Sequence, residues 1–350
     1  MRELCPRSYD VVERAELQSL RVDLFDDETR ENPVTVTVRQ DPSVGIPGVV
    51  YDCAVHLAAF VVDEVFPKVS TSSDERECGP VRVLELGAGT GACGCLLAAA
   101  CARRNVEIHL TLTDRKPAAL ALCAANLAAN ACVFSRKTSF HEKKYATRRY
   151  AFGDPIDDLL RDPDPIDDSR VPSGGVAHDD GDDGDDGDDA REKKKRADDT
   201  GADDTTVSPA RPRYDVVLAS DVLYDEASAA PLAGTLRDLL APTNHGAERK
   251  NARCLNKAVC FLAWRPRAAS PNKASAVRAF LAACAARRLR VREAFEAPEG
   301  KKTASAAKAV LRASDASNAT RGWVESLTAR DAAERGVRVL RIEAVEEGYA

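Results

Sequence analysis

The sequence predicts an α/β protein built on one doubly wound, mostly parallel sheet. Short apolar or β-branched runs of strand length alternate with longer alanine- and leucine-rich runs at helical spacing. One run, Val81–Leu86, leads through Gly87, Gly89 and Gly91 into a helix, which is the order of the first strand–turn–helix unit in such a sheet. About seven strands can be counted, and we expect an antiparallel strand at the C-terminal end.

Two elements are expected before the glycine run. Val34–Arg39 alternates β-branched with other residues and predicts a strand, with a weaker strand signal at 22–25. Residues 40–48 are rich in proline and glycine and predict a turn, and apolar positions recur at helical spacing over 53–66. We describe residues 1–80 as an N-terminal strand and helix extension.

The elements after the glycine run alternate between helix and strand, except that 304–335 is expected to be helical or irregular. In order they are strand 107–113, helix 116–130, a strand within 133–152, strand 214–219, helix 229–240, strand 257–264, helix 273–288, and closing strands 289–295 and 336–344.

A low-complexity acidic segment interrupts this pattern. Residues 155–211 contain repeated Asp-Asp-Gly units and few apolar residues, so they are expected to be a disordered, solvated insertion. Between 154 and 213 there are 20 acidic and 9 basic residues, which leaves a charge of about +5 for the rest of the chain. We therefore expect one domain, residues 1–350, with a core of 81–154 and 212–350.

Cysteine usage and hydropathy indicate the compartment. The eleven cysteines form no CxxC pair, and Cys93-x-Cys95 has the wrong spacing for zinc, so we expect reduced thiols and no metal site. No apolar run reaches about 18 residues, and the first ten residues contain no apolar leader segment. A soluble cytoplasmic protein without membrane or nucleic-acid partners is expected; the basic cluster 193–196 is too weak to establish nuclear import.

Two cofactor patterns overlap in the glycine run. Gly89-x-Gly91-x-x-Gly94 fits the dinucleotide pattern, and Asp114 follows at the spacing of a ribose-binding acid. Glu85-x-Gly87-x-Gly89-x-Gly91 equally fits S-adenosylmethionine-dependent methyltransferases. Because both cofactors carry an adenosine ribose, Asp114 does not distinguish them.

A second strand end favours methyl transfer. The buried strand 214–219 runs into Ser220 and then Asp221-Val-Leu-Tyr224, which places a carboxylate and a phenol at the carboxyl edge of the sheet. A dehydrogenase would be expected to carry a second domain with a catalytic base, but the five histidines stand in unremarkable settings.

Four blocks in the same order carry a family resemblance. They are VVYDCAVHLAAF, VLELGAGTGACG, LTDRKPAALALCAANLAAN and YDVVLASDVLY. With these blocks the chain resembles the family-16 seven-β-strand protein methyltransferases over residues 34–290, interrupted by the acidic insertion. Tyr51 stands in place of the family's tryptophan, and Phe152-Gly153 stands where the family has tryptophan-glycine, with Ala151 in place of an acidic residue.

The resemblance implies a monomer with a seven-stranded, Rossmann-like methyltransferase fold and S-adenosylmethionine as cofactor. It implies a lysine of a protein, such as an elongation factor or a chaperone, as substrate. It also implies that Asp221 orients the incoming amine and that Tyr224 lines its pocket. The implied cofactor-binding residues, with Glu85 and Gly91 added from the glycine pattern, are Tyr51, Glu85, Gly87, Ala88, Gly89, Gly91, Asp114, Phe152 and Ser220.

Other functions stay open at this point. The D-x-x-Y segment does not identify the acceptor, so a small-molecule or histidine N-methyltransferase is an alternative. A binding protein with a vestigial methyltransferase domain is a further alternative, although the intact site residues argue against it. A nicotinamide-dependent dehydrogenase is the remaining alternative.

Overall fold

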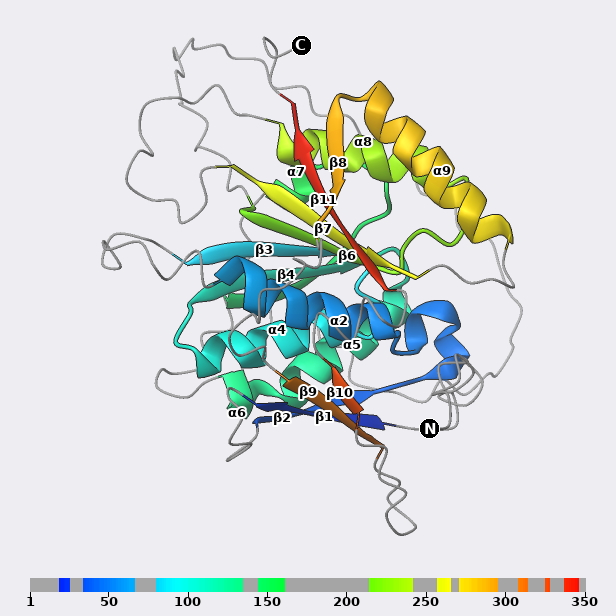
Figure 1. Ribbon diagram of the computed structural model, residues 1–350. Coiled ribbons are helices and arrows are strands. Elements are labelled where there is room, and N and C mark those ends of the chain that lie inside the picture. Colours follow the sequence, from blue (N-terminus) through cyan, green and yellow to red (C-terminus); the bar gives the residue numbers. More distant parts are fainter. Residues whose placement is uncertain are drawn as a thin grey trace, which may run out of the picture.

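The structure is a computed structural model, and the parts of the chain that it describes are shown as ribbons in Figure 1. The described residues are 19–25, 34–66, 80–134, 144–160, 214–241, 257–265, 271–294, 308–313, 325–327 and 337–345.

Seven strands form the main sheet in the order β5-β4-β3-β6-β7-β11-β8. Neighbouring strands from β5 to β7 are parallel, whereas β11 is antiparallel to both β7 and β8. The predicted fold class is therefore confirmed, including the antiparallel C-terminal strand. The strands are β3 (Val81–Leu86), β4 (Ile108–Asp114), β5 (Tyr145–Arg149), β6 (Val216–Ser220), β7 (Val259–Trp264), β8 (Leu289–Glu293) and β11 (Arg338–Ala344).

Helices cover both faces of this sheet, as Figure 1 shows. One face carries α2 (Asp52–Phe60), α4 (Ala92–Arg103) and α5 (Pro117–Ala129), and the opposite face carries α8 (Ala229–Leu240) and α9 (Pro271–Ala286). The helix expected over 53–66 continues beyond α2 as a π-helical turn, η4 (Val61–Val65), and the short α6 (Ala131–Phe134) follows α5.

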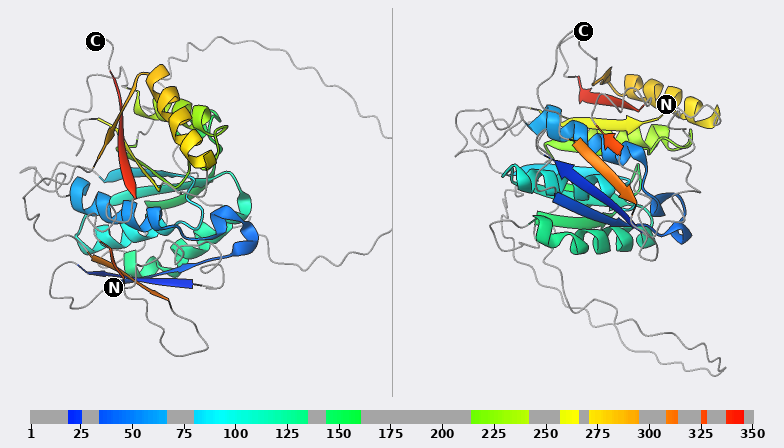
Figure 2. Two further views of the ribbon diagram at one scale, coloured as in Figure 1. Left: turned by 45° about the vertical axis from the view of Figure 1, so that its right-hand side comes forward. Right: turned by 60° about the horizontal axis from the view of Figure 1, so that its bottom comes forward.

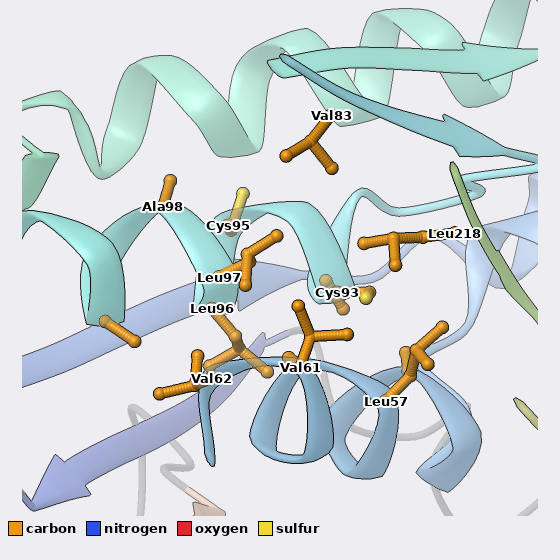
Figure 3. Close-up of a cluster of buried hydrophobic side chains, with 14 of the residues drawn as sticks. Leu57, Val61, Val62, Val83, Cys93, Cys95, Leu96, Leu97, Ala98 and Leu218 are labelled. Atoms are coloured by element: carbon orange, nitrogen blue, oxygen red, sulfur yellow. The ribbon is translucent and has the colours of Figure 1, made fainter. Parts of the chain in front are cut away.

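The core lies in two layers, one on each side of the sheet. Figure 3 shows the α2–α4 layer, where Leu57 and Val61 pack against Leu96 and Leu97 of α4 beneath Val83 of β3. All five side chains are at most 1% exposed. Burying a large aliphatic side chain stabilises a fold by roughly 1.5–3 kcal/mol, so this layer fixes α4, and with it the preceding glycine loop, against the sheet.

A second sheet, β10-β9-β1-β2, lies beyond the α2, α4 and α5 layer (Figure 2). It joins N-terminal strands β1 (Ser19–Phe25) and β2 (Val34–Arg39) to C-terminal strands β9 (Lys308–Ala313) and β10 (Glu325–Leu327). The expectation that 304–335 is helical or irregular is therefore wrong for β9 and β10. The strand β9 pairs with β1, which lies almost 300 residues earlier in the chain, and β10 in turn pairs with β9. Periodicity within a local window cannot reveal such a distant partner.

The acidic insertion was expected to begin at residue 155, and this boundary is also wrong. Residues 157–160 form a helical turn, α7 (Asp157–Leu160), in which Leu159 is 1% exposed. The Tyr214 hydroxyl donates to the Leu159 carbonyl oxygen at 2.8 Å, so the two described ends of this segment meet. The remainder of the predicted disordered insertion, 161–211, lies outside the described residues.

Two further observations concern membrane spans and disulfides. Among the described residues no helix combines the length and apolar character needed to cross a membrane. The eight cysteines in the described ranges form no disulfide, and burial raises the pKa of Cys93, Cys95 and Cys123 above the usual thiol value.

Candidate active site

A cavity of about 400 Å³ opens at the carboxyl ends of β3, β4 and β6. Sheet order reverses between β3 and β6, and such a reversal is where open α/β sheets bind ligands. Ten of the eleven residues predicted from the sequence line this cavity. They are Tyr51, Glu85, Gly87, Ala88, Gly89, Asp114, Phe152, Ser220, Asp221 and Tyr224.

Two glycines in the loop after β3 have left-handed backbones that leave no room for a side chain. Gly87 has φ +67° and Gly89 has φ +55°. A Cβ on Gly87 would lie 2.9 Å from the Val222 side chain, and one on Gly89 would lie 2.8 Å from the Pro47 carbonyl oxygen. Only glycine fits here, and its bare main chain forms part of the cavity wall.

Gly91 does not line the cavity, unlike the other predicted residues. It has φ +75° and immediately precedes α4, and a Cβ there would lie 2.6 Å from the Cys123 sulfur of α5. Instead of the predicted contact with a cofactor, the structure gives Gly91 a packing role, since it lets the start of α4 approach α5.

Asp114, the last residue of β4, is 6% exposed and bonded to two backbone amides. Its carboxylate accepts from Gly89 N at 3.1 Å and from Lys116 N at 3.0 Å. The end of β4 thus holds the glycine loop that follows β3. The same carboxylate lines the cavity, where it can accept hydrogen bonds.

Glu85 is a carboxyl group enclosed beneath the glycine loop, with 1% of the residue exposed. Burial raises its pKa to about 8, the Gly94 amide opposes the rise, and the Asp114 charge adds to it. One carboxyl oxygen, Oε2, has no hydrogen-bond partner among the described residues. Glu85 is therefore largely protonated in the folded protein at neutral pH.

The turn after β5 brings Phe152 to the cavity, and α8 holds this turn in place. Thr235 of α8 is 2% exposed, and its hydroxyl accepts from Gly153 N and pairs with the Tyr150 hydroxyl, both at 3.0 Å. Tyr150 also lines the cavity and donates to the Asp154 carbonyl oxygen at 2.9 Å. Sequence reasoning missed Tyr150 and Thr235, although a polar Thr235 on the buried leucine face of α8 was a usable signal.

The strand end after β6 supplies the other wall. Asp221 has φ +53°, and its amide donates to the Ala263 carbonyl oxygen of β7 at 2.9 Å. A left-handed backbone is uncommon for residues other than glycine. Residues with such strained backbones cluster at functional sites. The adjacent Ser220 hydroxyl is buried without a hydrogen-bond partner in the described part of the chain.

Tyr224 lines the cavity and is half-buried. Burial raises the pKa of its phenol above the ordinary value, while the nearby Arg115 guanidinium opposes that rise. The phenol is therefore neutral at physiological pH and can both donate and accept a hydrogen bond. Arg115 and Lys116 also line the cavity, and the sequence reasoning did not single them out.

The N-terminal extension completes the cavity. Two short 3₁₀ turns, η2 (Pro42–Val44) and η3 (Ile46–Gly48), follow β2. The cavity is lined by Ile46 and Pro47 of η3, by Val49, and by Tyr51, which directly precedes α2. The ends of this segment are tied together, because Val50 N donates to the Gln40 side-chain oxygen at 2.7 Å. The extension predicted from the sequence is thus a wall of the site.

A family comparison identifies the first part of this arrangement. The model of a family described as lysine methyltransferase matches residues 30–158, from just before β2 into α7. This part of the chain is therefore similar to the lysine methyltransferase family, as the sequence resemblance implied. The match supports an S-adenosylmethionine-dependent enzyme of the lysine methyltransferase type. The match ends before Asp221 and Tyr224, so their roles depend on the geometry of the cavity.

Solved structures of methyltransferases are also similar to this methyltransferase, at low identity. The DszA carbon methyltransferase has a TM-score of 0.40 and 12% identity over 84% of this chain, and the match spans 55% of that protein. A ribosomal-protein methylase from Lactobacillus delbrueckii subsp. bulgaricus has a TM-score of 0.36 and 9% identity, covering 88% and 86% of the two chains. The human methyltransferase 10 domain containing protein has a TM-score of 0.34 and 9% identity, covering 84% of each. No curated protein matches the chain.

The cavity of this methyltransferase fits S-adenosylmethionine. Gly87 and Gly89 leave bare main chain where a side chain would fill the cradle, and Asp114 presents a carboxylate suited to ribose hydroxyls. The orphaned hydroxyl of Ser220 is typical of a site that expects a polar ligand. Phe152 also lines the cavity, and its aromatic ring is suited to stacking on a base.

Proposed function

We propose that this protein transfers methyl groups to a lysine side chain of another protein, in the cavity that joins the glycine loop to the β6 strand end. One observation carries the proposal. Asp221 and Tyr224 line the same cavity as Gly87, Gly89 and Asp114, although more than 100 residues separate the two groups in the sequence. A cofactor-binding half and an acceptor-binding half therefore share one space.

The chain's own residues divide the work between these halves. S-adenosylmethionine, when bound, supplies an electrophilic methyl group. Asp114, Ser220 and the main chain at Gly87 and Gly89 hold and orient that cofactor, with Phe152 against its base. Asp221 accepts a hydrogen bond from the incoming amine and fixes its direction, and Tyr224 lines the amine's path. Orientation of two reactants is the main contribution that an enzyme makes to such a displacement.

The acceptor must be a neutral amine, whereas free lysine has a pKa of roughly 10.4. Asp221 alone would favour the charged ammonium, so the surroundings must oppose it. Val222, which is 4% exposed, and Phe152 give the cavity apolar walls that favour the neutral form. We propose that Asp221 acts on direction and that desolvation acts on protonation.

Radioactive labelling tests this function. The purified protein is incubated with tritiated S-adenosylmethionine and a cell extract, and label in one protein band that yields methyl-lysine on hydrolysis is the expected result. Elongation factors and chaperones, the targets implied by the family resemblance, are the first purified substrates to try. Label confined to small molecules or to methyl-histidine, or no label at all, would contradict the proposal.

Asp221→Asn separates the acceptor role from cofactor binding. Asparagine tolerates a left-handed backbone, so the substitution removes the charge with little strain. We expect kcat to fall by roughly 100-fold or more, while the affinity for S-adenosylhomocysteine measured by calorimetry changes little. Asp225→Asn is the matched control, because Asp225 also lines the cavity but its carboxylate accepts from Ser228 N next to α8. Equal losses in the two variants would rule out a special role for Asp221.

A further inference from the structure

Two asparagines four residues apart, Asn126 of α5 and Asn130 directly after that helix, bind the backbone of β2. Asn130 accepts from Thr37 N at 2.9 Å and donates to Thr37 O at 2.7 Å. Asn126 accepts from Arg39 N at 2.8 Å and donates to Arg39 O at 3.0 Å. The two side-chain amides therefore pair with one edge of β2 as a neighbouring strand would, while β1 pairs with the other edge.

The two asparagines differ in one contact. The Asn126 amide nitrogen also donates to the Thr90 carbonyl oxygen, at 2.9 Å, whereas the Asn130 amide nitrogen donates back to the carbonyl oxygen of Asn126 at 2.8 Å. Thr90 belongs to the glycine loop and lines the cavity. Asn126 alone of the pair therefore touches the loop that holds the cofactor.

Asn126 has no freedom to move without losing these bonds. The residue is 0% exposed, and both hydrogens of its amide are used, one on Arg39 O and one on Thr90 O. Buried polar groups whose hydrogen-bonding capacity is filled in this way fix one arrangement of the segments that they join. The segments joined here are β2, α5 and the glycine loop.

The chain that follows β2 meets the glycine loop again at the cavity wall. Beyond Arg39 the chain runs through Gln40 into the turn that contains Pro47, and Pro47 lies against Gly89 so closely that a Cβ there would lie 2.8 Å from the Pro47 oxygen. The shape of the cavity between Pro47 and the glycine loop thus depends on how β2 is placed relative to Thr90.

We propose that Asn126 is a positioning residue for cofactor binding, which sets the glycine loop against the N-terminal wall through its bonds to Arg39 and Thr90. The proposal rests on the assignment of this cavity as the S-adenosylmethionine site. Asn130 fastens the same strand but does not contact the loop, so the two residues have separable functions.

The matched variants Asn126→Asp and Asn130→Asp test this. Each keeps the acceptor oxygen and the side-chain shape, and each removes two donated hydrogen bonds and sets a carboxylate against carbonyl oxygens. Both variants are expected to melt at lower temperature than the wild type. Calorimetry with S-adenosylhomocysteine, at a temperature where both are folded, should show roughly tenfold weaker binding for Asn126→Asp and less than about twofold for Asn130→Asp.

Equal affinities for the two variants, or equal losses, would overturn the proposal. Wild-type binding serves as the reference: if the wild type fails to bind S-adenosylhomocysteine, the cofactor site itself is wrong, which is a different failure. Residue-resolved hydrogen exchange on the wild type covers the case in which a variant does not fold. Adding S-adenosylhomocysteine should then slow exchange of the Arg39 amide more than that of the Thr37 amide, and equal slowing would refute the coupling.

Discussion

Asp221 shows at the scale of one residue how the backbone directs a functional side chain. Its φ of +53° turns the chain immediately after β6, and its amide is held by Ala263 of the neighbouring strand. The sequence indicated a carboxylate at a strand end. The left-handed turn that faces it to the cavity depends on β7, whose pairing with β6 is not visible in the local sequence.

Glu85 gives a prediction about pH. Its pKa rises from 4.5 to about 8 on folding, so between these values the folded state holds a proton that the unfolded state has released. The free energy of unfolding should therefore fall as pH rises through this window, by up to about 1.4 kcal/mol per pH unit, and the contribution is fully present only below the unfolded value.

Glu85→Gln removes the titrating group while keeping its shape. Urea unfolding of both proteins without cofactor, at pH 5, 6, 7 and 8, measures the effect. We expect the variant to show a flatter dependence on pH than the wild type over this range. If the variant showed the same dependence of unfolding free energy on pH as the wild type, that dependence would come from groups other than Glu85.

Gly91 gives a prediction about packing. Gly91→Ala should lower the free energy of unfolding by about 1–3 kcal/mol, because the methyl group meets the Cys123 sulfur and the backbone is left-handed. Adding Cys123→Ala should recover part of that loss by removing the clash, and the remainder reports backbone strain. Affinity for S-adenosylhomocysteine should change little, since Gly91 does not line the cavity. A large loss of affinity in the double variant Gly91→Ala, Cys123→Ala would instead support the direct contact between Gly91 and the cofactor that the sequence predicts.

At the scale of elements, α8 positions a turn that belongs to another strand. Thr235 holds Tyr150 and Gly153, and a Cβ on Gly153 would lie 3.3 Å from the Pro231 side chain of the same helix. The Phe152 ring between them is thus placed by a helix about 80 residues further along the chain.

Thr235→Val tests this arrangement, because valine keeps the shape and removes the hydroxyl. Leaving Gly153 N and the Tyr150 hydroxyl without this partner should cost about 1–3 kcal/mol of unfolding free energy. It should also weaken S-adenosylhomocysteine binding by severalfold, through a less ordered Phe152. Thr235→Ser keeps the hydroxyl and should bind nearly as the wild type does. If serine weakened binding as much as valine, the lost methyl group rather than the hydrogen bonds would be the cause.

At the scale of the whole molecule, strands from near both ends of the sequence form one sheet. Strands β9 and β10 join β1 and β2 in the second sheet, so residues from both terminal regions cover the helix layer beneath the glycine loop. We expect the N-terminal extension and the core to unfold together, as parts of the single domain that we propose.

The acidic segment gives the prediction at this scale. Because the Tyr214 hydroxyl bonds to the Leu159 carbonyl, the ends of the segment are close enough for a short connection. Replacing residues 165–209 with a Gly-Ser linker of about six residues should leave the melting temperature and the affinity for S-adenosylhomocysteine nearly unchanged. If only the activity toward the protein substrate were lost, the segment would take part in substrate binding. If the shortened protein did not fold, the description of the segment as an insertion would be contradicted.

Most of the main sheet was predictable because its signals are local. Buried apolar runs predicted β6 and β7 of the main sheet, and helical spacing predicted α8 with the same bounds that the structure shows. Alternation likewise predicted β2 of the second sheet. The strands β9 and β10 were not predictable, since β9 is stabilised by pairing with the distant β1, and β10 by pairing with β9, rather than by patterns of their own.

The sequence by itself determined the order of the elements, the glycine loop and the types of side chain offered to a cofactor and an acceptor, because these depend on spacing between near neighbours. Only the tertiary structure decided which residues share the cavity. It placed Gly91 outside the lining of the cavity and brought Tyr150 and Arg115 into that lining. It also tied β2 to the loop through Asn126. The physical reason is that hydrogen bonds and packing between distant segments, unlike periodicity, leave no regular trace in the sequence.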